Sequence, residues 1–269
     1  MYSGLSCWRE AIFVALVLTA ILNLWISTMA VNTVTGNRAQ AMMKWNAGGR
    51  TGLPARPLAR PIFVVGFPKV GTTSIHAMFT CGGFKSSHYC CCGSNRSHTH
   101  CHGEGGDGRT FSECMRANKK AGRPILEGCG DYEVYAQMDA ELGSSIYLPQ
   151  HFDLDLLHAY SANATFLLNL RPANAWTKSV TRWYGLGGRF LTRFKVDIHK
   201  VNRNKALEEI FDNHTALIRD FVRKNPSHSL VEVDISNPSA GDTLSRAFGV
   251  PSFCWALHNK NKQTIIHGK

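Results

Sequence analysis

Acidic residues are scarce in this chain of 269 residues. Only 19 Asp and Glu stand against 30 Lys and Arg, which gives a formal net charge of +11 at pH 7. This imbalance favours an anionic partner over a cationic one. The chain also lacks a nucleic-acid recognition module and any internal repeat, which argues against a nucleic-acid-binding protein and against a repeat architecture. An acidic glycan fits the same charge.

Charged residues are missing from one long stretch, residues 11–31, which is mostly apolar. A helix of this length spans about 30 Å, so we expect a single N-terminal transmembrane helix after a short tail, residues 1–10. A cleaved signal peptide is the alternative, because residues 28–30 (Thr-Met-Ala) offer a small-residue cleavage site. Arg9 precedes the stretch and five basic residues follow it before Pro61, so counting charges does not support a cytoplasmic N-terminus.

The rest of the chain divides into a stem and one domain. Residues 32–60 contain Gly, Pro, Asn and basic residues without sustained periodicity, which predicts a flexible stem. Residues 61–269 are enough for one α/β domain of about 200 residues. Apolar periodicity there predicts a second strand over 84–89, helices over 111–121, 152–160, 207–222 and 243–248, a short strand within 123–132 and a last strand over 230–235. We expect a P-loop-like three-layer α/β domain with a central parallel sheet.

The strand-to-helix turn that begins this domain carries the clearest motif. Residues 62–65 form a short apolar run, which is typical of a buried parallel strand. Gly66, Pro68 and Gly71 break the strand, and a helix is expected from Thr72. The N–H groups of such a turn and the dipole of the helix form an anion site that phosphate usually occupies.

The lysine of this turn is not where a P-loop NTPase has it. That motif, G-x-x-x-x-G-K-[ST], places lysine after its second glycine and a hydroxyl for magnesium next to the lysine. Here Thr72 follows Gly71, and Lys69 lies two residues before that glycine. A nucleotide phosphotransferase of related fold is therefore the second interpretation, and it would need magnesium and an aspartate-ended strand.

A second buried-strand run, residues 164–171, ends in an arginine. The helix that follows is expected from Asn174, and Ser179 lies eight residues after Arg171. Arginine offers phosphate a planar fork of donors, and a serine hydroxyl on the helix adds another. Taken singly, these residues would be a surface ion pair and a solvated helix residue. Together with the anion turn, they predict a second phosphate site.

These motifs resemble those of the sulfotransferases that use 3′-phosphoadenosine 5′-phosphosulfate (PAPS). The 5′-phosphosulfate loop of that family reads Pro-Lys-x-Gly-Thr-Thr/Ser, as residues 68–73 do. In the family, a strand-end arginine and a serine eight residues later hold the 3′-phosphate. The resemblance covers residues 61–250, and it departs at a Cys/His insertion and at residues 172–174, where an Asp-Pro is common. It implies transfer of a sulfuryl group from PAPS to a hydroxyl, with no metal required.

The resemblance also assigns roles to residues. The donor contacts that it implies are Lys69, Val70, Gly71, Thr72, Thr73, Ser74, Arg171 and Ser179. Lys69 would be catalytic as well, because it can stabilise the charge that grows on the leaving phosphate oxygen. For the general base, Asp131 is the first choice, since it is expected to follow the strand before the Arg171 unit. Asp139 and His88 are the alternatives.

Within the family, the chain is similar to the membrane-anchored carbohydrate sulfotransferases, which are Golgi type II proteins. This likeness implies a cytoplasmic tail at residues 1–10, an uncleaved anchor at residues 11–31 and a luminal domain. The acceptor would be an anionic or neutral glycan or another hydroxyl of the secretory pathway. A non-catalytic luminal protein that binds a nucleotide or a metal is the third interpretation. The basic segment 182–205 fits a solvated face or a surface for an acidic substrate.

Cysteine is dense in and around an insertion at about residues 90–110. After the anchor the chain carries eight cysteines, which are Cys81, Cys90, Cys91, Cys92, Cys101, Cys114, Cys129 and Cys254. An even number in an oxidising compartment favours disulfides, with 105 possible pairings. The insertion holds histidines too, but no C-x₂-C…H-x₃-H pair with the usual spacing, so we expect no metal site. Sequons at Asn95, Asn163 and Asn213 agree with luminal exposure.

Overall fold

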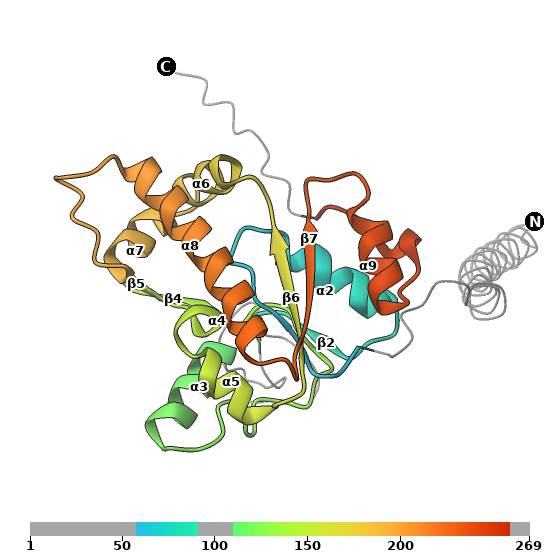
Figure 1. Cartoon of the computed structure of the whole chain (residues 1–269). Coiled ribbons are helices and arrows are strands. Elements are labelled where there is room, and N and C mark those ends of the chain that lie inside the picture. Colours follow the sequence, from blue (N-terminus) through green and yellow to red (C-terminus); the bar gives the residue numbers. More distant parts are fainter. Residues whose placement is uncertain (1–57, 91–109, 259–269) are drawn as a thin grey trace, which may run out of the picture. The chain divides into compact units, whose positions relative to one another are not determined.

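Five short parallel strands form the central sheet of the part of the chain that the computed structural model describes, residues 58–90 and 110–258 (Figure 1). Their order across the sheet is β2 (Ser86–Ser87), β3 (Val134–Tyr135), β1 (Ile62–Val64), β6 (Thr165–Leu170) and β7 (Ser229–Asp234), each parallel to its neighbours. The chain builds the β2–β3 side of β1 first and then returns to β6 on the other side. A ligand crevice opens at the carboxyl ends of the strands at such a switch point.

Helices cover both faces of the sheet, which gives the α/β fold that the sequence predicts. α2 and α9 pack on one face, against Ile62 and Val64, while α3, α5 and α8 pack on the other, against Phe63 and Val65. Because successive side chains of a strand point to opposite faces, the apolar run at β1 serves both cores. The described helices are α2 (Thr72–Cys81), α3 (Phe111–Lys120), α4 (Pro149–Phe152), α5 (Leu154–Tyr160), α6 (Ala173–Thr181), α7 (Leu186–Arg193), α8 (Arg203–Lys224), α9 (Ala240–Phe248) and the 3₁₀ turn η1 (Ser252–Cys254), and an antiparallel hairpin joins β4 (Ala140–Leu142) to β5 (Ser145–Tyr147).

A third apolar cluster supports the turn between β1 and α2. Phe67 of this turn is fully buried and stacks on His214 of α8, with ring centroids 3.8 Å apart. It also meets Trp176 of α6 at 5.6 Å and Phe190 of α7 at 5.0 Å. His214 in turn hydrogen-bonds to the carbonyl of Val65 through Nε2 at 2.7 Å. The turn is therefore seated on packed core, although it is a loop.

Most of the elements expected from the sequence form. The strands expected over 62–65, 164–171 and 230–235 correspond to β1, β6 and β7, and the helix expected over 111–121 is α3. The strand expected over 84–89 is shorter than predicted, because β2 has only 2 residues.

The short strand expected within residues 123–132 does not form, and that prediction is wrong. The strand of this region is β3, which begins later, at Val134. Backbone groups that a strand would pair with a neighbour are used locally instead, since Asn118 Nδ2 donates to the carbonyl of Glu127 at 2.7 Å. The disulfide Cys114–Cys129 ties the same segment to α3. These two links turn the chain back on α3 rather than along the sheet.

Several sequence predictions concern residues outside the described ranges. They include the anchor at 11–31, most of the stem at 32–60 and the insertion at 91–109. Within residues 58–90 and 110–258, no helix combines the length and the apolar character that a bilayer crossing requires.

Disulfides form among the cysteines that the structure describes. Cys81 pairs with Cys254 and Cys114 with Cys129, and Cys90 is disulfide-bonded as well. The expectation of disulfides is thus confirmed for these five cysteines. Cys81–Cys254 joins the last residue of α2 to the segment that follows α9.

Removing the long-range disulfide should cost more stability than removing the short-range one. Cys81 and Cys254 are separated by 173 residues, against 15 for Cys114 and Cys129. Because a cross-link restricts the unfolded chain more when it closes a longer loop, the chain-entropy relation gives losses of about 5 and about 3 kcal/mol. Urea unfolding of the two double Cys→Ser variants measures both losses. Equal losses would mean that loop length does not set the stabilisation.

Candidate active site

One side chain of β6 holds the turn between β1 and α2. Asn169 Oδ1 accepts a hydrogen bond from the N–H of Gly66 at 3.0 Å, and its Nδ2 donates to the carbonyl of Val70 at 2.8 Å. The approach is so close that a Cβ atom at position 66 would lie 2.3 Å from the Asn169 carbonyl oxygen. Glycine is required here because the turn packs directly against β6.

The three successive carbonyls of the turn are all bonded to the β6–α6 unit. Their donors are Trp176 Nε1 to Pro68 at 2.9 Å, Arg171 Nη1 to Lys69 at 3.2 Å and Asn169 Nδ2 to Val70 at 2.8 Å. Gly71 follows with a φ of 82° and precedes α2, and its position has no side chain that could cap this helix. The first N–H groups of α2 therefore have no intrahelical partner, and such a helix start binds phosphate.

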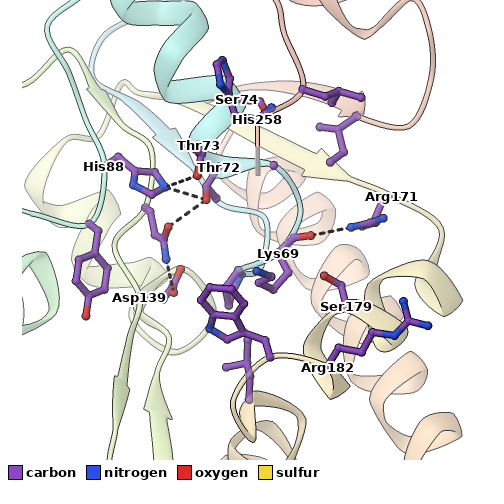
Figure 2. A pocket seen from close by; sticks show the side chains of 18 of the residues that line it. Lys69, Thr72, Thr73, Ser74, His88, Asp139, Arg171, Ser179, Arg182 and His258 are labelled. Carbon is purple, nitrogen blue, oxygen red and sulfur yellow. Dashed lines mark hydrogen bonds between the residues drawn. The ribbon is translucent and has the colours of Figure 1, made fainter. Parts of the chain in front are cut away.

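The turn lines a cleft of about 1140 Å³ (Figure 2). Its charged lining residues are Lys69, Arg171, Lys178, Arg182, Asp139 and Glu141. Ala175, Lys178, Ser179 and Arg182 follow one another at i, i+3, i+4 and i+7, so α6 and its last turn present them on one face. Sequence reasoning selected only Ser179 from this face. The same spacing would have indicated Lys178 and Arg182.

Arg171 and Ser179 lie at the same cleft as the turn, as the sequence spacing predicts. Burial lowers the pKa of Arg171, while nearby Asp234 acts to raise it. Its Nε is buried and has no hydrogen-bond partner among the described residues. A buried guanidinium N–H needs an acceptor, and a phosphate oxygen in the cleft would supply one. Ser179 is buried at the cleft, within reach of a ligand that sits against α6.

Lys69 lies inside the turn with a φ of 73°, an unusual value for a residue with a side chain. Its ammonium nitrogen lies 3.5 Å from the centre of the Trp183 ring. Burial lowers the pKa of Lys69; the Glu141 carboxylate acts to raise this pKa, and the Arg171 charge acts to lower it further.

Asp131 does not lie at the cleft. The sequence prediction placed it after a strand, but it precedes β3. It therefore lies at the amino ends of the parallel strands, whereas the turn after β1 lies at their carboxyl ends. Its side chain is fully exposed, with Lys85 Nζ at 4.0 Å. The reason is the failed strand within 123–132, since the strand that leads to the cleft is β3, which ends at Tyr135 and is followed by Asp139.

Asp139 follows β3 and lines the cleft, with only 4% of its surface exposed. Its two carboxylate oxygens accept hydrogen bonds from Gln137 Nε2 at 3.1 Å and Gln150 Nε2 at 3.2 Å. Burial raises the pKa of Asp139 to about 6, even though these two hydrogen bonds act to lower it. A carboxylate with such a pKa is a stronger base than an exposed one and is still ionised at pH 7.

His88 also lines the cleft, but its Nε2 is already engaged. It lies 3.1 Å from Thr72 Oγ1, and this hydroxyl donates its only proton to Gln137 Oε1. His88 Nε2 must therefore carry the proton and donate to Thr72. Burial lowers the pKa of His88 to about 4, and neighbouring His76 lowers it further. Asp139 is the better proton acceptor of the two.

The last described residues form one wall of the cleft. Leu257 and His258 line it, and the N–H of His258 donates to Ser74 Oγ at 2.9 Å. The disulfide Cys81–Cys254 holds the start of this segment at the far end of α2. Residues 254–258 therefore run from the last residue of α2 back to its first turn.

Comparison with known proteins supports a sulfotransferase family. Residues 61–186 match a family model described as a sulfotransferase domain. This stretch includes the turn, Asp139, Arg171 and Ser179. No curated protein and no solved structure matches the chain. Among residues 58–90 and 110–258, no group of three or more His, Cys, Asp or Glu could hold a metal ion.

Asp139 should make the stability of the protein depend on pH. Because its pKa rises from 3.8 to about 6 on folding, the stabilisation that comes from its protonated form is present below pH 4 and is lost as the pH rises through 6. Relative to wild type, Asp139→Asn should therefore gain up to about 3 kcal/mol of unfolding free energy between pH 4 and pH 8. Urea unfolding at several pH values measures this change, with the exposed Asp131→Asn as the matched control. A difference that is constant with pH would contradict the raised pKa.

Proposed function

We propose that the chain transfers a sulfuryl group from PAPS to an acceptor hydroxyl. The match to a sulfotransferase domain supports a transferase of this general kind. The observation that carries the proposal is that the α2 turn, Lys69 and Arg171 meet at one cleft, and that Arg171 Nε has no hydrogen-bond partner among the described residues. The α2 turn with Lys69 and the separate Arg171 suit a donor that carries one phosphate on the 5′ position and another on the 3′ position of its ribose.

Each donor group has protein partners in this proposal. The N–H groups from Val70 to Ser74 would hold the 5′-phosphate at the start of α2. Arg171 and Ser179 would hold the 3′-phosphate, which would give Arg171 Nε the acceptor that it lacks within residues 58–90 and 110–258. PAPS supplies the activated sulfuryl group when it is bound. Lys178 and Arg182 add positive charge on the same side of the cleft.

The transfer itself needs two further groups. The acceptor oxygen forms a bond to sulfur while the bond from sulfur to the phosphate oxygen breaks. Lys69 stabilises the negative charge that develops on this leaving oxygen. Asp139 takes the proton of the acceptor hydroxyl, because it is ionised above about pH 6 and lies at the cleft. His88 holds Thr72 of the turn and takes no proton.

A nucleotide phosphotransferase is less well supported. In a P-loop enzyme the hydroxyl that follows the loop lysine is a magnesium ligand. Thr72 Oγ1 follows Gly71 instead and is bonded to Gln137 and His88. The Golgi membrane, the type II anchor at residues 11–31 and a glycan acceptor are part of our proposal, and they rest on the resemblance to carbohydrate sulfotransferases.

Arg171→Ala and Ser179→Ala should each reveal the 3′-phosphate site. We expect adenosine 3′,5′-bisphosphate to bind at least tenfold more weakly to either variant, since a charged hydrogen bond contributes about 1.5–3 kcal/mol. Adenosine 5′-phosphate should lose much less, because it lacks the 3′-phosphate. Isothermal titration calorimetry measures both ligands, with the exposed Arg223→Ala as control. Equal losses for the two ligands would remove this assignment.

Lys69→Ala and Asp139→Asn should separate the two catalytic roles. Lys69→Ala should lower turnover a hundredfold or more, about 3 kcal/mol, with donor binding nearly intact. Asp139→Asn should also bind the donor, but its loss in rate should shrink with more acidic acceptor hydroxyls. Transfer of labelled sulfate from PAPS to a panel of polysaccharides and phenols, without added metal, measures the rates, and Asp131→Asn should behave as wild type.

Two outcomes would contradict these roles. Full activity in Lys69→Ala would overturn the sulfotransferase proposal itself. Normal transfer in Asp139→Asn together with loss of transfer in His88→Gln would move the general base to His88 and leave the donor site unchanged.

A further inference from the structure

The ammonium group of Lys69 rests on an aromatic face rather than on a carboxylate. Its nitrogen lies 3.5 Å from the centre of the Trp183 indole ring, close enough for a strong cation–π contact. Trp183 lies just after α6 and is 40% exposed, so it is not a core residue whose role is to fill space. Its position at the cleft therefore calls for another explanation.

One further hydrogen bond fixes the position of Trp183, and its acceptor is itself held by an arginine. The indole Nε1 donates to Glu141 Oε1 at 3.1 Å, and the other oxygen of Glu141 pairs with Arg189 Nη1 at 2.9 Å. Arg189 Nε is in turn bonded to the carbonyl of Gly143 at 2.8 Å. The β4–β5 hairpin thus contacts the indole directly through Glu141, and α7 supports it indirectly, because Arg189 holds Glu141 and the hairpin in place. A ring fixed in this way can hold a cation at a defined place.

The surroundings of Lys69 work against its charge. Burial lowers its pKa, and Arg171 at the end of β6 lowers it further. The other titratable groups that line the cleft are His88 and Tyr89 near β2, Asp139 after β3, Lys178 and Arg182 of α6, and His258 after η1. Glu141 is the carboxylate that acts to raise the pKa of Lys69, and Asp234 of β7 acts on Arg171. Among the described residues, the Trp183 ring face and the Glu141 carboxylate are thus the neighbours that favour the charged form of Lys69.

We infer that Trp183, clamped by Glu141 and Arg189, is a positioning residue that keeps Lys69 protonated and in place beside the donor turn. The inference rests on the proposed function, in which Lys69 must be an ammonium ion to stabilise the leaving oxygen. A neutral amine at this position could not do so. Activity should therefore fall as the pH rises through the pKa of Lys69. By keeping Lys69 protonated, Trp183 and Glu141 move this alkaline limb of the activity profile to a higher pH.

The ionisation of Lys69 can be measured without any assay of transfer. The rate at which trace acetic anhydride acylates Lys69, followed by peptide mass spectrometry across a pH series, reports the deprotonated fraction, with the exposed Lys85 as internal reference. We expect Trp183→Leu and Glu141→Gln each to lower the pKa of Lys69 by roughly 0.5 to 1 unit. Trp183→Phe keeps a ring face and should restore most of the shift seen in Trp183→Leu.

Matched controls distinguish the clamp from general effects. Glu232→Gln removes an ion pair with Arg219 whose carboxylate side chain is 35% exposed, against 36% for Glu141. Phe253→Leu removes another exposed aromatic ring, which is 58% exposed and does not line the cleft. Neither control should change the pKa of Lys69. Thermal unfolding checks that all variants fold.

The pH dependence of turnover is the second readout. The alkaline limb of kcat should move to lower pH in Trp183→Leu and Glu141→Gln by the same amount as the pKa from acylation, while donor binding at pH 6 stays close to wild type. An unchanged pKa of Lys69 in both variants would overturn the inference. A wild-type chain without sulfate transfer would overturn the proposed function instead, and the acylation result would still decide whether the clamp exists.

Discussion

The rest of the site depends on the hydrogen bonds that Asn169 makes to Gly66 and Val70. These bonds join β6 to the turn after β1, so that Arg171, the residue after β6, comes to lie against Lys69. Two motifs that are about a hundred residues apart in sequence thereby share one cleft. The turn does not need to be ordered by a ligand, because its carbonyls are bonded to β6 and α6 and Phe67 is buried in an aromatic cluster.

Charge is distributed unevenly across the cleft. The β6–α6 side brings Arg171, Lys178 and Arg182, whereas the β3–β4 side brings Asp139 and Glu141. In the proposed reaction, an anionic donor would be attracted to the first side, and a hydroxyl that must lose a proton would be best placed on the second. The two carboxylates have different partners and therefore different roles. Asp139 accepts hydrogen bonds from neutral amides, whereas Glu141 forms an ion pair with an arginine.

Local patterns were sufficient to predict from the sequence that Lys69, Arg171 and Ser179 lie at one cleft. The strand, the glycines and Lys69 are contiguous, and Arg171 and Ser179 are on a strand end and the next helix, so periodicity alone brings them to one edge of a parallel sheet. The choice of Asp131 failed because Asn118 and the Cys114–Cys129 disulfide draw that segment away from the sheet. Such side-chain links leave no mark on periodicity. The contact between Lys69 and Trp183 is equally invisible, because it depends on how α6 ends.

The disulfide Cys81–Cys254 gives the cleft a dependence on its chemical surroundings. The bond fixes the start of the segment whose end, Leu257 and His258, forms a wall of the cleft beside the start of α2. In a reducing cytosol this bond would not persist, and the wall would be held by the bond from His258 to Ser74 and by local packing. The same polypeptide made in two compartments would thus differ in how firmly this wall of the cleft is held.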